Sequence, residues 1–225
     1  MSSVIHLIEC KIHIDAGCGS GRFLDVVSRS NAHLVGIDAT AAIDSAARML
    51  TARGAWGRVA LLQATIEDLP FREQSFDFIY SIGVLHHTPD IARGIRHLVR
   101  LLAPGGSLAI WLYYPSGTGM TLSNFWWPIL RNLPERALLA FIRPFTALYP
   151  IYRLRPWGIP LRVLFPICMH PDPEMRLLGT FDSYSPRYNW QTTYPDAIRF
   201  FEEAGLMDIQ IDPFPTSVRG RVKAS

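Results

Sequence analysis

Residues 11–22 read KIHIDAGCGSGR, and this stretch decides the fold. Its first residues are rich in isoleucine, which is typical of a short buried strand, and this strand ends on the carboxylate of Asp15. Gly17, Gly19 and Gly21 follow at alternate positions, and residues 21–29 can form a helix. Glycines in such a turn let a ligand approach the backbone where a Cβ would clash. The stretch therefore predicts a ligand-binding turn between a strand and a helix.

Strand-like and helix-like runs alternate on the C-terminal side of this turn. The sequence predicts strands over 33–38, 58–63, 75–81, 107–113, 206–211 and 217–222, and helices over 41–53, 90–102 and 194–204. Such alternation indicates parallel strands joined by right-handed crossovers. Residues 104–106, Pro-Gly-Gly, predict a turn that stops the preceding helix.

The spacing of the glycines separates two classes of nucleoside-binding protein. The dinucleotide fingerprint G-x-G-x-x-G, read from Gly17, would need a third glycine at position 22, where this chain has Arg22. The turn here is the tighter G-x-G-x-G. Asp38 ends the next strand, where a carboxylate accepts hydrogen bonds from ribose hydroxyls in either class. A nucleoside ligand is therefore expected, and an NAD-dependent oxidoreductase is the less favoured alternative.

Five segments in order resemble one enzyme family. They are IDAGCGSGRF, LVGIDA, EDLPF, QSFDFIYSIGVLHHTPD and LVRLLAPGGSLAIW, spread over about residues 11–113. In sequence, order and spacing the chain resembles the class I S-adenosylmethionine (SAM)-dependent methyltransferases, in the branch called methyltransferase type 11. The resemblance implies one α/β, Rossmann-like domain over 1–225, with a seven-stranded, mostly parallel sheet and helices on both faces. It also implies strand order 3-2-1-4-5-7-6 with the last strand antiparallel.

The resemblance also implies roles for the residues of the glycine turn. Asp15 and the loop of Gly17, Cys18, Gly19 and Gly21 would hold the methionine moiety of SAM. Because no base partner is suggested nearby, Cys18 is not expected to act as a nucleophile. No metal site is expected.

A second group of residues would hold the adenosine moiety. By the same resemblance Asp38 binds the ribose hydroxyls, Ala39 lines the adenine, Thr65 and Ile66 flank the adenine edge, and Ser81 lies near the sulfonium. Many relatives carry an acidic residue where this chain has Thr65. A threonine hydroxyl accepts more weakly than a carboxylate from the adenine amino group. The sequence therefore also leaves open a catalytically silent SAM-binding protein.

Methyl transfer to a hydroxyl needs a positioned base. His86 and His87 follow the fourth strand, at the edge of the sheet where ligands bind, and are the candidates. The alternative is that an imidazole here bonds a backbone carbonyl or shapes the loop. His170 is expected to be a loop residue.

Residues 115–190 interrupt the alternation and are interpreted as an insertion or cap. Between Met120 and Ile167 they contain six arginines against one glutamate, together with Trp126, Trp127 and Trp157. One interpretation is a helical cap with aromatics packed inward; the other is a surface over 120–167 that meets a lipid-like acceptor or a membrane. The two are compatible.

Two further features of the insertion and the N-terminal end stay open in the sequence. Tyr184 and Tyr188 either hydrogen-bond an acceptor or fill space beneath the insertion.

Relatives usually carry a helix before the first strand, and about ten residues precede it here. Either the chain is a truncated or mis-started version, or the insertion supplies the missing cover.

Composition and charge limit the kinds of partner and the cellular compartment that the sequence predicts. The formal net charge is +3 without any block of Lys and Arg, so a nucleic-acid partner is not expected. Three cysteines without a C-x-x-C pair favour a reducing, cytoplasmic compartment. Prolines and glycines interrupt the uncharged stretch 103–130, which therefore does not predict a spanning helix. We expect methyl transfer from SAM to a small-molecule or lipid-like acceptor, at oxygen or carbon; the sequence does not identify the acceptor or the oligomeric state.

Overall fold

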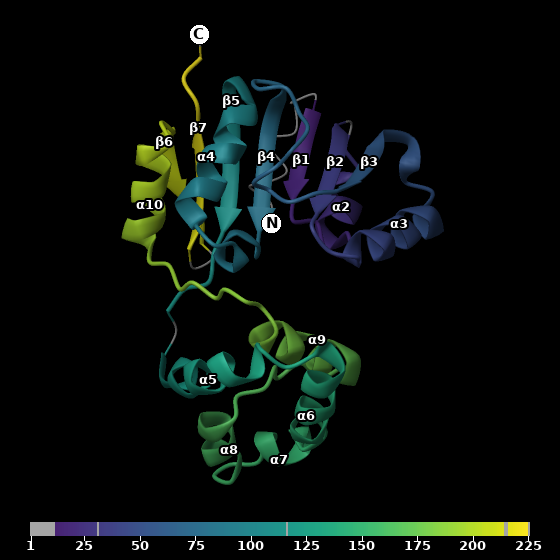
Figure 1. The fold of residues 1–225 in the computed structure, drawn as a ribbon, viewed down its shortest axis with the longest axis vertical. Coiled ribbons are helices and arrows are strands. Elements are labelled where there is room, and N and C mark those ends of the chain that lie inside the picture. Colours follow the sequence, from purple (N-terminus) through teal and green to yellow (C-terminus); the bar gives the residue numbers. More distant parts are fainter. Residues whose placement is uncertain (1–11, 31, 116, 214–215, 225) are drawn as a thin grey trace. The chain divides into compact units, whose positions relative to one another are not determined.

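The computed structural model describes residues 12–30, 32–115, 117–213 and 216–224. The chain forms two compact units (Figure 1). The first, called the sheet unit, comprises residues 1–114 and 190–225; the second, called the helical unit, comprises residues 115–189. The helical unit coincides with the insertion that the loss of strand and helix alternation indicates.

Seven strands form one sheet in the order β3-β2-β1-β4-β5-β7-β6, which confirms the predicted order. β1 to β5 run parallel, and β7 lies antiparallel to both β5 and β6, as expected. The reversal of order beside β1 brings the C-terminal ends of β1, β2 and β4 together at one edge, where ligands of such sheets bind. The strands are β1 (Ile12–Ala16), β2 (His33–Asp38), β3 (Val59–Gln63), β4 (Phe76–Ile82), β5 (Leu102–Trp111), β6 (Met207–Ile211) and β7 (Ser217–Arg221).

Helices cover both faces of the sheet, because alternate residues of its buried strands point to opposite sides. On β2, Leu34 packs in a cluster with α2 (Arg22–Val27) and α3 (Ala42–Arg53). Ile37 of the same strand points to the larger cluster formed with α4 (Ile91–Leu101) and α10 (Tyr194–Glu203). Short 3-10 helices η1 (Trp56–Arg58) and η2 (Leu85–His87) precede β3 and α4.

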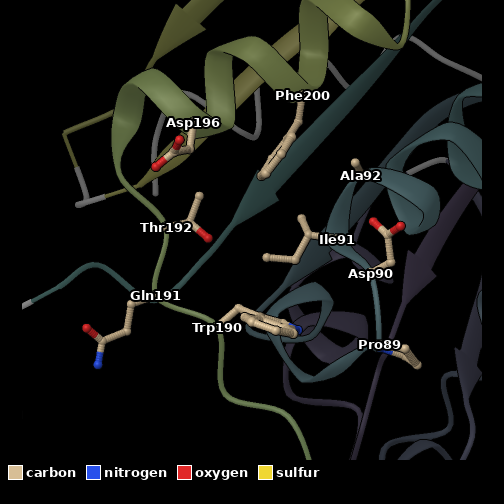
Figure 2. Close-up of a pocket in the computed structure, with 9 residues that line it drawn as sticks. All are labelled: Pro89, Asp90, Ile91, Ala92, Trp190, Gln191, Thr192, Asp196 and Phe200. Atoms are coloured by element: carbon tan, nitrogen blue, oxygen red, sulfur yellow. The ribbon is translucent and has the colours of Figure 1, made fainter.

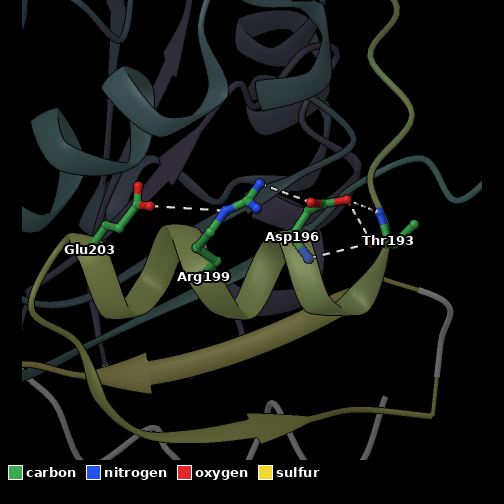
Figure 3. A network of polar contacts seen from close by, with 4 residues as sticks. All are labelled: Thr193, Asp196, Arg199 and Glu203. Atoms are coloured by element: carbon green, nitrogen blue, oxygen red, sulfur yellow. Dashed lines mark hydrogen bonds and ion pairs between the residues drawn. The ribbon is translucent and has the colours of Figure 1, made fainter.

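The start of α10 is fixed by a capping box. Thr193 Oγ1 accepts from the Asp196 amide at 3.4 Å, while the Asp196 carboxylate accepts from the Thr193 amide and hydroxyl (Figure 3). Arg199 continues the chain of contacts along the helix, 2.9 Å from Asp196 and 3.9 Å from Glu203. These ion pairs are solvent-exposed and each contributes at most about 1 kcal/mol. The cap sets where the chain leaves the irregular segment 190–192 and becomes helical.

The prediction that residues 104–106 form a simple turn before a strand starting at 107 is wrong in detail. β5 begins at Leu102, which pairs with Phe76, and pairing resumes at Ser107 with Phe78. Residues 103–106 therefore form a bulge within the strand, with Gly105 at φ +77°. A Cβ on Gly106 would lie 2.8 Å from the carbonyl oxygen of Ala103, so the bulge requires glycine there.

The helical unit contains five helices among the described residues. They are α5 (Gly117–Leu130), α6 (Glu135–Ala147), α7 (Tyr149–Arg153), α8 (Gly158–Leu164) and α9 (Pro173–Tyr184). Its own core contains seven buried side chains, namely Leu130, Leu138, Ile142, Tyr152, Phe165, Ile167 and Tyr184. None of the described helices of the chain is long and apolar enough to cross a membrane.

Tyr184, one of the two candidate acceptor contacts, belongs to this core. Its ring stacks on Phe165 at a centroid distance of 5.1 Å, and its hydroxyl donates to the Pro166 carbonyl at 2.8 Å. Of the two interpretations of Tyr184, the structure favours the one in which its ring fills space. His170 accepts from the Asp172 amide at 3.1 Å, which is a loop contact, as expected.

Replacing Ile95 by alanine tests the larger core cluster. Ile95 is fully buried where α4 packs on the sheet. The Ile95→Ala variant is expected to lose about 2–5 kcal/mol of unfolding free energy, since the cavity it leaves adds to the lost transfer energy. The measurement is urea denaturation followed by circular dichroism.

The matched control is Ile211→Ala, because Ile211 lies in β6 with its side chain exposed. This variant is expected to stay within about 0.5 kcal/mol of the parent protein. Equal losses in the two variants would contradict the assignment of the core.

Candidate functional site

The glycine turn is bonded to the end of the neighbouring strand. The amides of Gly17 and Cys18 both donate to the carbonyl of Ile37, at 2.7 and 2.8 Å. The Gly19 amide donates to Asp38 Oδ2 at 2.8 Å, and the Gly21 amide closes the turn on the Cys18 carbonyl at 2.9 Å. The glycine turn and the carboxylate that ends β2 are therefore bonded directly to each other.

Gly17 and Gly19 of this turn differ in the space that surrounds a Cβ at each position. Gly17 has φ +90°, and a Cβ there would lie 2.2 Å from a methyl group of Val84. Gly19 has φ +52°, and a Cβ there would meet no atom within 4 Å. Packing therefore requires Gly17, whereas the space over Gly19 is open to a ligand.

The Asp38 side chain is half-buried, and part of its hydrogen-bonding capacity is already used within the protein. Its Oδ1 accepts from the Thr40 amide at 2.9 Å and the Thr40 hydroxyl at 2.6 Å, and its Oδ2 accepts from Gly19. Each carboxylate oxygen offers about two acceptor positions. Among the described residues, Oδ2 thus keeps a position for a hydroxyl of a ligand. A second hydroxyl would have to displace the side chain of Thr40.

Asp15 is buried behind the turn. Burial raises the pKa of its carboxyl to about 8; the Tyr80 hydroxyl beside it offsets part of this shift, and the Asp38 charge adds to it. Neither Asp15 Oδ2 nor the Tyr80 hydroxyl makes a hydrogen bond of normal geometry with a described residue. The carboxyl is therefore largely protonated at neutral pH, and a positively charged group bound nearby would favour its ionised form.

The other expected cofactor contacts have varied surroundings. Ala39 and Thr65 are exposed, while Ile66 belongs to the larger core cluster. Ser81 is fully buried and its hydroxyl donates to the Ala16 carbonyl at 2.8 Å. Ser81 thus joins the ends of β1 and β4 beside the turn.

The Cys18 side chain packs inside the smaller core cluster with α2 and α3. Burial, together with the charges of Asp15 and Asp38, raises the pKa of its thiol to about 12. A thiol that stays protonated is a poor nucleophile, as expected for Cys18.

The two candidate bases lie in an aromatic cluster after β4. The His86 ring stacks on Tyr113 at a centroid distance of 3.8 Å and meets the His87 ring edge-on at 4.1 Å. His86 is fully buried, and neither of its ring nitrogens bonds to a described residue. Burial and the neighbouring His87 lower the pKa of His86 to about 3. Such an imidazole is a weak proton acceptor, whereas His87 is half-buried.

A shallow cavity of about 260 Å³ lies between the start of α4 and the segment that leads into α10 (Figure 2). Its lining includes Ile91, Trp190 and Phe200. The Trp190 amide donates to the His86 carbonyl at 3.0 Å, and its indole donates to the Thr88 carbonyl at 3.0 Å. The sequence did not predict this cavity, because its lining comes from two segments about a hundred residues apart.

Asp15→Asn tests the burial of this carboxyl in the ligand-free protein. Between about pH 4 and pH 8 the folded protein keeps a proton that the unfolded chain releases, so stability falls as pH rises. This carboxyl adds a slope of at most about 1.4 kcal/mol per pH unit. Asparagine removes this titrating group. The melting temperature of Asp15→Asn minus that of the parent protein is therefore expected to increase from pH 5 to pH 8.

The control is Asp44→Asn, which removes an exposed carboxylate from α3. Its melting temperature should follow that of the parent protein at every pH. An Asp15→Asn profile parallel to the parent profile would show that the carboxyl is ionised in the folded protein.

Part of the sheet unit is similar to known proteins. Residues 14–110 match the family model of a methyltransferase domain. The probable tRNA methyltransferase 9B of Bos taurus is 39% identical over 102 residues, which are 44% of this chain and 20% of that protein. The ubiquinone biosynthesis O-methyltransferase of Nitrobacter winogradskyi is 32% identical over 96 residues, 43% of this chain and 36% of that protein. The matches therefore span well under half of these relatives.

A solved structure extends the likeness of fold to nearly the whole chain. The SAM-dependent methyltransferase from Aquifex aeolicus has a TM-score of 0.57 at 15% identity, covering 98% of this chain and 88% of that chain. The matched family model runs from β1 to β5 and contains the glycine turn, Asp38 and the histidine pair. Residues 14–110 are therefore similar to a methyltransferase domain, and the solved structure shares the fold of the chain.

Proposed function

We propose that the chain transfers a methyl group from SAM to a small-molecule or lipid-like acceptor, at oxygen or carbon. The observation that carries the proposal is the pairing of Asp38 with the glycine turn. Asp38 Oδ2 holds the Gly19 amide at 2.8 Å, and no atom occupies the space where a Cβ of Gly19 would point. A polar ligand can approach the backbone there and meet a carboxylate.

The residues present fit SAM. In the proposal Asp38 binds the ribose, Ala39, Thr65 and Ile66 border the adenine, and Gly19 lies against the methionine moiety. The Asp15 carboxyl is buried behind the turn, and a ligand that carries positive charge would favour its ionised form. Bound SAM supplies an electrophilic methyl group, so the protein has to orient the acceptor and exclude water.

For a hydroxyl acceptor we assign proton removal to His87. His86 lies deeper, and its lowered pKa makes it a poor base. Its stacking on Tyr113 and its edge contact with His87 instead make it a positioning residue for the His87 ring. A carbon acceptor that is already nucleophilic would not need this base.

The acceptor class rests on composition and on relatives. The N. winogradskyi relative is an O-methyltransferase of ubiquinone biosynthesis, whereas the B. taurus relative is a probable tRNA methyltransferase. This chain has no block of Lys and Arg to bind an RNA backbone, which supports a small acceptor. The apolar character of the helical unit supports a lipid-like one. A cytoplasmic location is part of the proposal.

The test is formation of S-adenosylhomocysteine with a panel of phenols, prenylated quinols, fatty acids and a tRNA. Product with a small or lipid-like acceptor supports the proposal. Product with tRNA alone would replace the proposed acceptor class. SAM binding without product from any acceptor would favour a silent SAM-binding protein, and binding of NADH with no response to SAM would favour an oxidoreductase.

Gly19→Ala tests the open space over the turn. At φ +52° alanine costs about 1–2 kcal/mol of backbone strain, and its methyl group meets no protein atom. The methyl group would instead occupy the space proposed for SAM. We expect a modest drop in melting temperature and at least about tenfold weaker SAM binding by calorimetry, a loss of about 1.4 kcal/mol.

Gly54→Ala is the matched control. Gly54 caps the C-terminal end of α3 at φ +62°, and a Cβ there also meets no atom within 4 Å. Its backbone strain is comparable, but it lies outside the proposed site. Its SAM affinity should equal that of the parent protein. Unchanged affinity in Gly19→Ala would remove the cofactor from this turn.

A further inference from the structure

The outward face of α8 is apolar throughout. Ile159 and Val163, one turn apart, are exposed, and so are Pro160 and Leu164 beside them. The opposite side of the helix contains the buried Gly158 and the half-buried Leu161. A surface helix ordinarily presents polar residues to solvent. The solvent-facing side of α8 presents apolar residues instead.

The apolar surface extends on both sides of this face. Trp157, which precedes α8, is 73% exposed, and Leu154 before it is 56% exposed. On α5, Phe125 and Ile129 lie one turn apart and are exposed as well. The indole of Trp126 donates to the Leu164 carbonyl at 2.7 Å, which holds α5 beside α8. The surface formed by residues 154–164 with Phe125 and Ile129 is called the apolar tip.

The apolar tip is held in place by close packing and by hydrogen bonds from side chains to backbone carbonyls. A Cβ on Gly158 would lie 2.2 Å from the Tyr152 carbonyl oxygen, so the start of α8 packs directly on α7. Arg162 Nε donates to that same carbonyl at 2.9 Å, and the Tyr152 hydroxyl donates to the Phe165 carbonyl at 2.9 Å. The exposed side chains therefore project from an ordered support.

The charge around the apolar tip is positive. Arg153 precedes the apolar tip in the chain and Arg155 lies within it, and both side chains are exposed. Between Met120 and Ile167 the chain carries six arginines and, as its only acidic residue, Glu135. Apolar and aromatic side chains next to arginines suit the boundary between the headgroups and acyl chains of an anionic membrane.

We propose that the apolar tip is a peripheral binding site for anionic phospholipid surfaces, with Trp157, Ile159 and Leu164 entering the headgroup boundary and Arg153 and Arg155 contacting lipid phosphates. This narrows the membrane contact expected over 120–167 to about a dozen residues of one segment and their neighbours on α5. The proposal concerns the helical unit and is independent of SAM binding by the sheet unit.

A lipid surface accounts for the charge better than a second copy of the chain does. A symmetric contact between two tips would bring Arg153 and Arg155 of both copies to one interface, and like charges oppose such a contact. An anionic membrane takes up both the apolar side chains and the arginines.

The experiment is co-sedimentation of the full chain with vesicles of phosphatidylcholine, alone or mixed with phosphatidylserine. The parent protein is expected to bind the mixed vesicles more strongly, and added salt should weaken this binding. The triple variant W157S/I159S/L164S is expected to lose at least about tenfold in partitioning. The pair R153Q/R155Q should lose the preference for phosphatidylserine.

The matched control is W56S, which removes a tryptophan 44% exposed on η1 of the sheet unit. Circular dichroism checks that each variant folds; the single variant W157S, at the most exposed tryptophan, serves if the triple variant does not. Binding by W157S and the triple variant equal to that of the parent would overturn the proposal. A second outcome would also overturn it. In that outcome the parent protein binds no vesicles but self-associates, and W157S and the triple variant abolish this self-association.

SAM titration of the same variants separates this proposal from the proposed function. Changes at the apolar tip should leave SAM affinity as in the parent protein. Loss of vesicle binding with intact SAM binding supports the tip, whereas a protein that binds vesicles but not SAM would fail only the proposed function.

Discussion

The carbonyl oxygen of Ile37 accepts two backbone amides, those of Gly17 and Cys18, and the candidate site depends on this shared acceptor. The two bonds join the turn after β1 to the last residues of β2, so the Gly19 amide comes within 2.8 Å of Asp38. The positive φ of Gly17 makes the approach possible, and Val84 fills the space that a side chain there would need. Main-chain geometry therefore fixes the positions of the polar groups before any ligand binds.

The sheet unit could be predicted from sequence because each of its elements carries a local signal. Apolar runs ending on Asp15 and Asp38, glycine punctuation and the amphipathic α4 all indicated the same parallel arrangement. The helical unit carries no comparable set of local sequence signals. Its helices α5 and α6 contain Pro128 and Pro144, and α7 and α8 are short, so periodicity was too weak to separate them from loops.

The sequence could propose residues for the candidate site, but it could not predict their environment. Spacing along the chain indicated which residues lie at the ends of strands, yet it could not show that Asp15 is enclosed or that the Ser81 hydroxyl already donates to Ala16. It also could not rank His86 against His87, because the full burial of His86 arises only in the folded protein. Burial is a property of the assembled sheet, and adjacent residues can differ in it, as the buried His86 and the half-buried His87 do.

The insertion leaves and re-enters the sheet unit between residues that are bonded to each other. The Thr192 amide donates to the Tyr113 carbonyl at 2.8 Å, and the Thr192 carbonyl accepts from Thr216 Oγ1 at 3.0 Å. Because the exit and return points are fastened within the sheet unit, the intervening 75 or so residues can be exchanged or shortened as a cassette. Evolution could in this way fit new acceptors or new surfaces to one nucleoside-binding scaffold while its strand register stays unchanged.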